Sequence, residues 1–313
     1  MQSSDLSAFV TFTRNKWATL AGNTDFPLTQ HDVAKLAAMG DPITISEVDA
    51  IYRPLTALMH MYARNTGRLF SESKNFLGFS DVRVPWIVGI AGSVSAGKST
   101  VARLLRELLS RSPETPRVDL VTTDGFLFPN AVLNEQRLLA RKGFPESYDR
   151  RAILEFLAAV KSGKRNVTAP VYDHITYDIV PDRVITVDQP DILIVEGLNV
   201  LQPAPGIAAH EFSAVSDFFD FTIYVDAPEE ALERWYIDRF LTLRTTAFTN
   251  EASYFKNYSD LTDSQARETA RQIWGAINLP NLRHNIAPTK NRATVILTKG
   301  PSHAIDQVQI RKL

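Results

Sequence analysis

The residues from Gly92 to Ser99 place two glycines, a lysine and a hydroxyl side chain at the spacing G-x-x-x-x-G-K-[ST]. Glycines at these positions let backbone N–H groups close around phosphate oxygens, and the start of a following helix adds partial positive charge. Lys98 would bridge the β- and γ-phosphates of a nucleotide, and the Ser99 hydroxyl would supply an oxygen to Mg²⁺. The pattern predicts a nucleoside triphosphate site made by Gly92, Ser93, Val94, Ser95, Ala96, Gly97, Lys98, Ser99 and Thr100.

Two carboxylates follow short apolar runs and are candidates for the chemistry itself. Asp124 comes after the run 118–122, so in a parallel α/β sheet it lies at the carboxyl edge, where ligands collect. A carboxylate there can accept the proton of an attacking hydroxyl, although a turn aspartate before glycine is the ordinary alternative. Glu196 ends the run 191–195 and is expected to hold Mg²⁺, with a helix N-cap or loop acid as its alternative.

Other classes of nucleotide-binding protein use motifs that this sequence lacks. A guanine-specific GTPase usually carries N-K-x-D and D-x-x-G motifs. The only Asn-Lys pair is at 15–16, followed by Trp and Ala, and no Asp is followed by Gly three residues later. An ATPase motor needs an acidic pair after its second core strand, where this chain has T-T-D-G at 122–125. The pattern therefore favours phosphoryl transfer to a small-molecule hydroxyl.

The elements that must position these residues follow from the hydrophobic pattern. From Pro85 onward, short apolar runs alternate with amphipathic segments, which is typical of an α/β fold with a mostly parallel sheet and helices on both faces. The expected helices include 100–109, 229–244 and 264–277. The expected strands are 86–90, 118–122, 192–195 and 221–225, with two shorter ones near 183–187 and 293–297.

The first 84 residues are expected to form a helical N-terminal extension. Thr29 with Asp32, and Ser46 with Asp49, are spaced like capping boxes and precede apolar residues at helical spacing. We predict one domain over residues 1–313, in which 85–313 form the α/β core of a P-loop kinase with a lid and substrate-binding helices.

Composition limits the possible partners. The chain has 313 residues, with 34 Lys plus Arg against 35 Asp plus Glu, so no overall basic field favours nucleic acid or an anionic membrane. Cysteine is absent, which excludes disulfides and thiolate chemistry. The sequence shows no secretory signal and no apolar stretch of membrane-spanning length, so a cytoplasmic protein is expected.

Longer motifs are more specific than the phosphate-binding loop. They are 15–17 (NKW), 122–127 (TTDGFL), 142–148 (KGFPESY), 169–172 (APVY), 190–202 (PDILIVEGLNVLQ), 224–228 (YVDAP), 235–236 (WY), 245–248 (TTAF) and 310–313 (IRKL). Together with 92–100 they resemble the type I (bacterial) pantothenate kinases over nearly the whole chain. The resemblance implies a homodimer that uses ATP and Mg²⁺ to convert pantothenate into 4′-phosphopantothenate, the entry to coenzyme A synthesis. It also implies feedback inhibition by coenzyme A or its thioesters in competition with ATP.

The resemblance assigns roles to single positions. Asp124 is the base that faces the pantothenate hydroxyl, and Lys98 and Arg239 act on the transferring phosphoryl group. Residues implied in pantothenate binding are Tyr172, His174, Tyr177, Tyr236 and Asn278. His303 is implied to stack on adenine, while Arg103, Phe240 and Phe248 receive the coenzyme A inhibitor.

Alternatives stay open for the residues and for the function. His174 could be a surface histidine, Tyr236 and Phe240 core residues, Arg239 a solvated or ion-paired side chain, and Arg103 a helix-surface partner of Glu107. Within the enzyme class, a relative of uridine kinase or phosphoribulokinase is the alternative. Outside it, a regulator could bind ATP without transferring a phosphoryl group.

Overall fold

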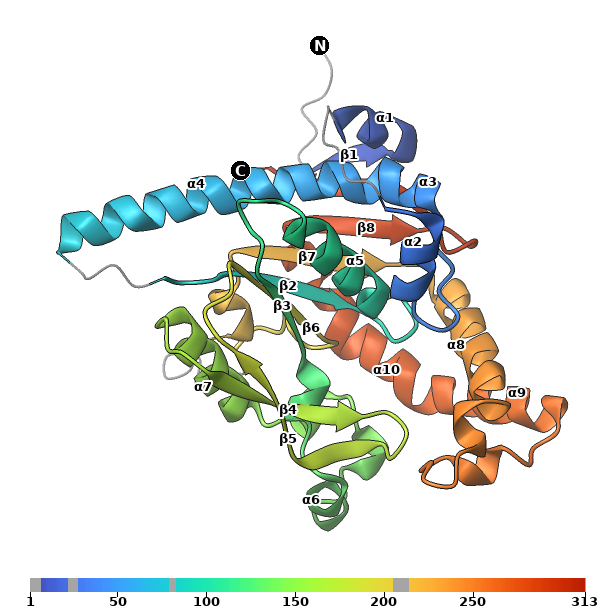
Figure 1. The fold of residues 1–313 in the computed structure, drawn as a ribbon. Coiled ribbons are helices and arrows are strands. Elements are labelled where there is room, and N and C mark those ends of the chain that lie inside the picture. The colour runs from blue at the N-terminus through green and yellow to red at the C-terminus, as the bar shows by residue number, and fades with distance from the viewer. Residues whose placement is uncertain (1–6, 22–27, 79–82, 205–213, 313) are drawn as a thin grey trace.

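The computed structural model describes residues 7–21, 28–78, 83–204 and 214–312, arranged as Figure 1 shows. The strands are β1 (Phe9–Thr13), β2 (Trp86–Gly92), β3 (Val118–Thr122), β4 (Val167–Asp173), β5 (Asp178–Val187), β6 (Ile192–Glu196), β7 (Phe221–Asp226), β8 (Val295–Lys299) and β9 (Ile305–Arg311). The α-helices are α1 (Arg14–Ala18), α2 (Gln30–Leu36), α3 (Ile45–Glu47), α4 (Arg53–Leu77), α5 (Lys98–Ser110), α6 (Asn130–Glu135), α7 (Arg150–Lys161), α8 (Glu229–Arg244), α9 (Asp263–Ile273) and α10 (Leu279–Asn281).

The main sheet of the described chain has seven strands in the order β1-β9-β8-β7-β2-β6-β3. Neighbouring strands from β8 to β3 run parallel. Every residue of β2 and β6 is buried, as expected for parallel strands whose two faces are both covered. These strands confirm the predictions made from continuous apolar runs, including the shorter run near 293–297.

The sheet edge beyond β8 is antiparallel and was not predicted. β9 pairs with β8, and β1 pairs with β9 from Phe9↔Arg311 to Thr13↔Gln307. The helical N-terminal region is present as α1 to α4, but it begins with a strand that extends the sheet. Another antiparallel pair, β4 and β5, forms a hairpin outside the main sheet, and the strand predicted near 183–187 is the second half of β5.

The two predicted helix starts in the N-terminal region have different outcomes. Thr29 accepts a hydrogen bond from the backbone N–H of Asp32, whose carboxylate accepts from the backbone N–H of Thr29, so this capping box is confirmed. The start at Ser46 is wrong because Thr44 has the extended backbone of an N-cap and accepts from the N–H of Glu47. Ser46 already lies within the first turn.

Helices cover the sheet and fix the direction of the loops that leave it. α5 packs on β2, β3 and β6, and α4 contacts α5 and extends beyond the sheet (Figure 1). Tyr62 of α4 lies against Phe221 of β7, with ring centroids 5.1 Å apart. The predicted helices 100–109 and 229–244 are confirmed, and 264–277 is α9 continued by a π-helical turn, Trp274–Asn278. None of the helices in the described ranges has the length and apolar character needed to cross a membrane.

Candidate active site

The phosphate-binding loop connects the end of β2 to the start of α5. Gly97 has φ +92°, a left-handed conformation that strains residues with a side chain, and α5 begins at the next residue. Lys98 folds back over the loop and donates from Nζ to the Ser93 carbonyl at 2.9 Å. The hydroxyls of Ser93 and Ser95 are buried and have no hydrogen-bond partner in the described part of the chain. The loop therefore offers free polar groups and a helix N-terminus to a phosphate chain.

Glu196, at the end of β6, lies beside the start of α5. Its Oε1 accepts a hydrogen bond from Ser99 Oγ at 3.1 Å, while Oε2 is buried and has no partner among the described groups. Burial raises the pKa of Glu196, and the charge of Lys98 opposes that rise. Burial likewise lowers the pKa of Lys98, against the charges of Glu196 and Asp124. Ser99 and Glu196 fit a Mg²⁺ site completed by phosphate oxygens.

Asp124 lies in the 3₁₀ turn Thr123–Phe126, which directly follows β3. Its Oδ1 accepts a hydrogen bond from the Tyr148 hydroxyl at 3.3 Å. Burial and the Asp124 charge raise the pKa of Tyr148 well above its usual value, so the phenol keeps its proton and remains a donor. Asp124 thus has a fixed orientation at the carboxyl edge of the sheet.

The predicted substrate residues come from two parts of the chain. Tyr172, His174 and Tyr177 belong to the β4–β5 hairpin, where Tyr172 lies edge-on to His174 and Tyr177 at centroid distances of 5.1 and 6.1 Å. Burial raises the pKa of Tyr236 of α8 to about 12, and the nearby side chain of Asn278 in the π-helical turn opposes that rise. Burial raises the pKa of Tyr177, and the Tyr236 and Asp124 charges raise it further. A Cβ added to Gly125, next to Asp124, would collide with the Pro170 carbonyl of β4, so the hairpin packs on the turn that carries the carboxylate.

Lys142 was not predicted as a site residue, although it begins the K-G-F-P-E-S-Y motif. Its Nζ donates to Asn130 Oδ1 at 2.6 Å and to the Tyr177 carbonyl at 2.5 Å. The same ammonium lies 4.1 Å from the ring centroid of Tyr177 and 4.9 Å from that of Tyr172. Burial lowers the pKa of Lys142 to about 8. The only sequence signal for it was the motif, because a single lysine before glycine has no chemical signature.

Arg239 and His303 lie near the phosphate-binding loop. Arg239 lines a small cavity with Lys98, Ser99 and residues 38–41, and its Nε has no partner among the described groups. His303 stacks on Trp235 with centroids 3.9 Å apart and planes at 21°. One face of the imidazole is therefore covered by an indole, which leaves only the opposite face for a base.

The residues predicted to receive coenzyme A are spread over two regions. Arg103, on α5, donates from Nε to the Leu36 carbonyl at 2.8 Å. The alternative pair with Glu107 is not formed, since Glu107 binds Arg111 at 2.8 Å. Phe240 and Phe248 contact each other edge-on at 5.4 Å within a separate apolar cluster that includes Phe255 and Tyr258.

Comparisons with known proteins identify the family of the chain. The model of the Phosphoribulokinase / Uridine kinase family matches residues 87–248. A pantothenate kinase of Cutibacterium acnes is 54% identical over 97% of this chain and 94% of its own length. One of Parvibaculum lavamentivorans is 53% identical over 100% of this chain and 96% of its own. The D-glycerate 3-kinase of Cryptococcus neoformans shares the fold, with a TM-score of 0.51 and 16% identity over 78% of this chain and 97% of its own. The chain therefore belongs to the phosphoribulokinase/uridine kinase family and, within it, to the bacterial pantothenate kinases.

Proposed function

We propose that the protein transfers the γ-phosphoryl group of ATP to the hydroxyl of pantothenate in the cytoplasm, giving ADP and 4′-phosphopantothenate. The observation that carries this proposal is the position of Asp124. Its charge acts on Lys98 and Glu196 at the phosphate-binding loop and also on Tyr172 and Tyr177 in the hairpin. A single carboxylate thus lies between a triphosphate site and an aromatic, hydroxyl-rich pocket.

The chemical step follows from that placement. The substrate hydroxyl oxygen forms a bond to the γ-phosphorus, its proton passes to Asp124, and the bond from phosphorus to the β–γ bridging oxygen breaks. Lys98 and Arg239 are the cations available to the charge that develops on the phosphoryl oxygens. Mg²⁺, held by Ser99 and Glu196, would neutralise further phosphate charge.

The pocket suits an anionic, amide-containing substrate. Tyr236 and Asn278 offer a hydroxyl and an amide, Lys142 offers a cation, and the rings of Tyr172 and Tyr177 form apolar walls. A uridine kinase-like specificity is the second candidate, because the matched family model is that of the Phosphoribulokinase / Uridine kinase family. A nucleoside carries no carboxylate to pair with Lys142, which favours pantothenate.

A coupled assay of ADP release with pantothenate, pantetheine and uridine in parallel tests the proposal. We expect turnover with pantothenate and none with uridine. Asp124→Asn, purified in the same way, is the matched control for contaminating kinases. Turnover with uridine alone would support the second candidate, and ATP binding without any turnover would support a regulator.

We also propose that coenzyme A inhibits the protein by competing with ATP.

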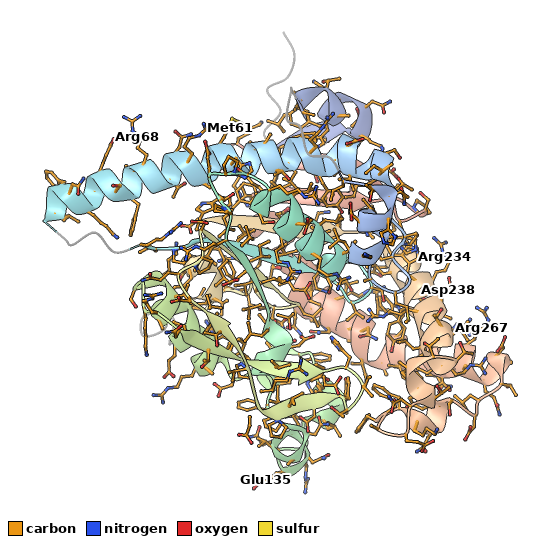
Figure 2. All side chains as sticks on the ribbon, viewed as in Figure 1. Met61, Arg68, Glu135, Arg234, Asp238 and Arg267 are labelled. Atoms are coloured by element: carbon orange, nitrogen blue, oxygen red, sulfur yellow. The ribbon has the colours of Figure 1, made fainter. Side chains whose placement is uncertain are left out.

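We further propose that the protein forms a homodimer through α4. Met61 and Arg68 point away from the body on this helix (Figure 2), and its outer turns expose Leu69 and Phe76 to 65% and 90%. Leu69 and Phe76 lie seven residues apart and so share one face. Light scattering should give a dimer mass for the wild type and a monomer mass for a Leu69→Glu, Phe76→Glu variant; a monomeric wild type would contradict the dimer.

A further inference from the structure

The segment that follows α2 lies against the phosphate-binding loop, although the sequence placed it in an extension. The backbone N–H of Ala38 donates to Thr100 Oγ1 at 2.9 Å, and the Leu36 carbonyl accepts from Arg103 at 2.8 Å. A Cβ added to Gly40 would lie 3.7 Å from Cβ of Arg239. Residues 38–41 therefore form one wall of the cavity that Lys98, Ser99 and Arg239 line.

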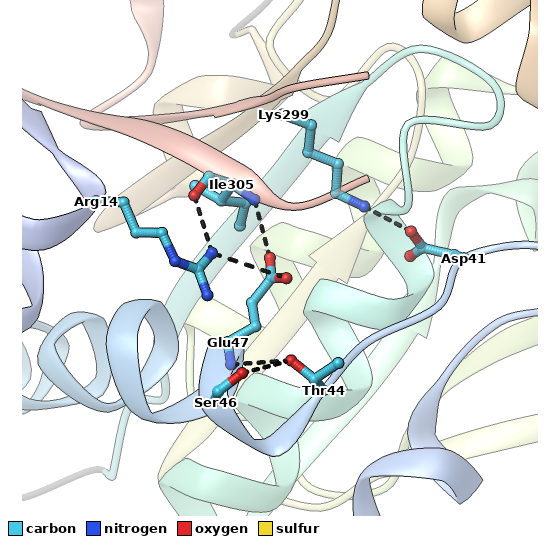
Figure 3. Close-up of polar contacts among 7 residues, drawn as sticks. All are labelled: Arg14, Asp41, Thr44, Ser46, Glu47, Lys299 and Ile305. Carbon is cyan, nitrogen blue, oxygen red and sulfur yellow. Dashed lines mark hydrogen bonds and ion pairs between the residues drawn. The ribbon is translucent and has the colours of Figure 1, made fainter. Parts of the chain in front are cut away.

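Asp41 ends this wall and is almost completely buried. Its Oδ1 accepts from Lys299 Nζ at 2.6 Å, with the two side chains 7% and 4% exposed, and lies 3.5 Å from His303 Nδ1. Figure 3 shows the Asp41–Lys299 contact. Burial alone would raise the pKa of Asp41, but contacts with His303, Lys299 and Thr100 outweigh it, so the pKa is lowered and the side chain is ionised.

A second carboxylate from the same segment holds the other side of the β8–β9 turn. Glu47 Oε1 accepts from the backbone N–H of Ile305 at 3.0 Å, and Arg14 donates to the Ile305 carbonyl at 3.1 Å (Figure 3). Lys299 precedes this turn and Ile305 follows it. Asp41 and Glu47 thus fix both ends of the turn that carries His303.

The Asp41–Lys299 pair also lies directly against the phosphate-binding loop. A Cβ added to Gly97 would collide with the Asp41 carboxylate and with Lys299 Nζ. One buried ion pair therefore touches both the loop expected to bind phosphates and the turn whose histidine is expected to stack on the base. These two parts of the chain are not neighbours in sequence, so only a tertiary contact can set their separation.

We propose that Asp41 is a positioning residue of the nucleotide site, which sets the phosphate-binding loop at a fixed distance from the turn bearing His303. The proposal rests on ATP being the phosphoryl donor. Loss of the Asp41 charge then mispositions one half of the nucleotide site relative to the other, while Asp124 and the β4–β5 hairpin keep their places. We expect the KM for ATP to rise by about ten- to a hundredfold, with a smaller change in kcat and in the KM for pantothenate.

Three variants separate positioning from stability. Asp41→Asn and Lys299→Met each leave one member of a buried pair, so both should melt at a lower temperature and bind MgADP more weakly. The double variant leaves no unpaired buried charge, so its melting temperature should recover while its affinity for MgADP does not. Asp220→Asn is the matched control, because it breaks the part-buried Lys161–Asp220 pair (2.5 Å) at the amino end of β2. Asp220→Asn should lower the melting temperature without weakening the binding of MgADP.

We would measure MgADP affinity by calorimetric titration, stability by thermal melting, and steady-state kinetics with both substrates varied. Together these measurements test the positioning role of Asp41. Weakened nucleotide binding in the Asp41 and double variants, with Asp220→Asn unaffected, supports the proposal. It is overturned by a wild-type affinity in folded Asp41→Asn, or by a double variant that recovers affinity together with stability. A wild type that binds MgADP but transfers nothing to pantothenate would refute the proposed function and leave this comparison valid.

Discussion

The low pKa of Lys142 predicts that the use of pantothenate depends on pH in a range where few other groups titrate. The ammonium lies 4.9 Å from the ring centroid of Tyr172 and 4.1 Å from that of Tyr177, and burial lowers its pKa to about 8. Only the protonated form attracts the carboxylate of pantothenate. As pH rises through the pKa of the free enzyme, the cation is lost and kcat/KM for pantothenate should fall.

The size of the effect follows from the pKa. A group with pKa about 8 is about nine-tenths protonated at about pH 7 and about one-eleventh protonated at about pH 9, so kcat/KM should fall about tenfold over that interval. Ordinary lysines titrate near 10.4 and would give no change there. The direction of the change in kcat/KM follows from the charge: deprotonation of Lys142 removes the positive charge that attracts the carboxylate, so kcat/KM falls as pH rises.

The assay is ADP release at saturating ATP, with pantothenate varied across the pH interval. Lys142→Arg is the matched control: it keeps a cation that does not titrate, so its profile should stay flat. Lys142→Met should be flat as well, at a low kcat/KM. The reasoning is refuted if the wild-type profile is flat to about pH 9, or if Lys142→Met has the wild-type kcat/KM.

Further substitutions test the other site residues. Lys98→Met should abolish transfer in a folded protein, because a cation next to the transferring group is lost; near-normal turnover with an unchanged melting curve would contradict the loop assignment. Asp124→Asn should lower kcat by roughly 10²–10⁴-fold with ATP affinity largely kept, and a main effect on ATP binding would make Asp124 a metal or structural residue instead. Arg103→Ala should raise the inhibition constant for coenzyme A much more than the KM for ATP, measured from inhibition curves at several ATP concentrations; an unchanged constant would leave Arg103 with its contact to Leu36 alone.

The parallel core could be predicted because its signals are local. Each of β2, β3, β6 and β7 is an apolar run of a few residues, and Gly97-Lys98 at the start of α5 is a fixed motif. The capping error at Ser46 was also local: Thr44 and Glu47 have the same spacing, and only backbone conformation distinguishes the two starts. The residue that caps a helix depends on how the preceding chain enters it.

The contribution of the N-terminal region to the site could not be predicted. Asp41 follows a glycine and precedes a proline, which indicates only a turn. The structural role of Asp41 depends on its ion pair with Lys299, 258 residues away, and a single sequence gives no signal of such a pairing. β1 is similar, because five residues of mixed apolar and polar character do not reveal that their partner is β9. The Asp41–Lys299 pair and the β1–β9 pairing both join segments that are far apart in the sequence.

The pairing of β1 with β9 and of Asp41 with Lys299 has a consequence for how the protein is made. Ribosomes add about 5–20 residues per second, so the 258 residues between Asp41 and Lys299 take about 13–50 seconds to synthesise. The nascent chain therefore presents its phosphate-binding loop long before the lysine that secures the wall beside it has been added. During that interval the first strand has no partner and the loop lacks its final support. A complete nucleotide site emerges only with the last strand.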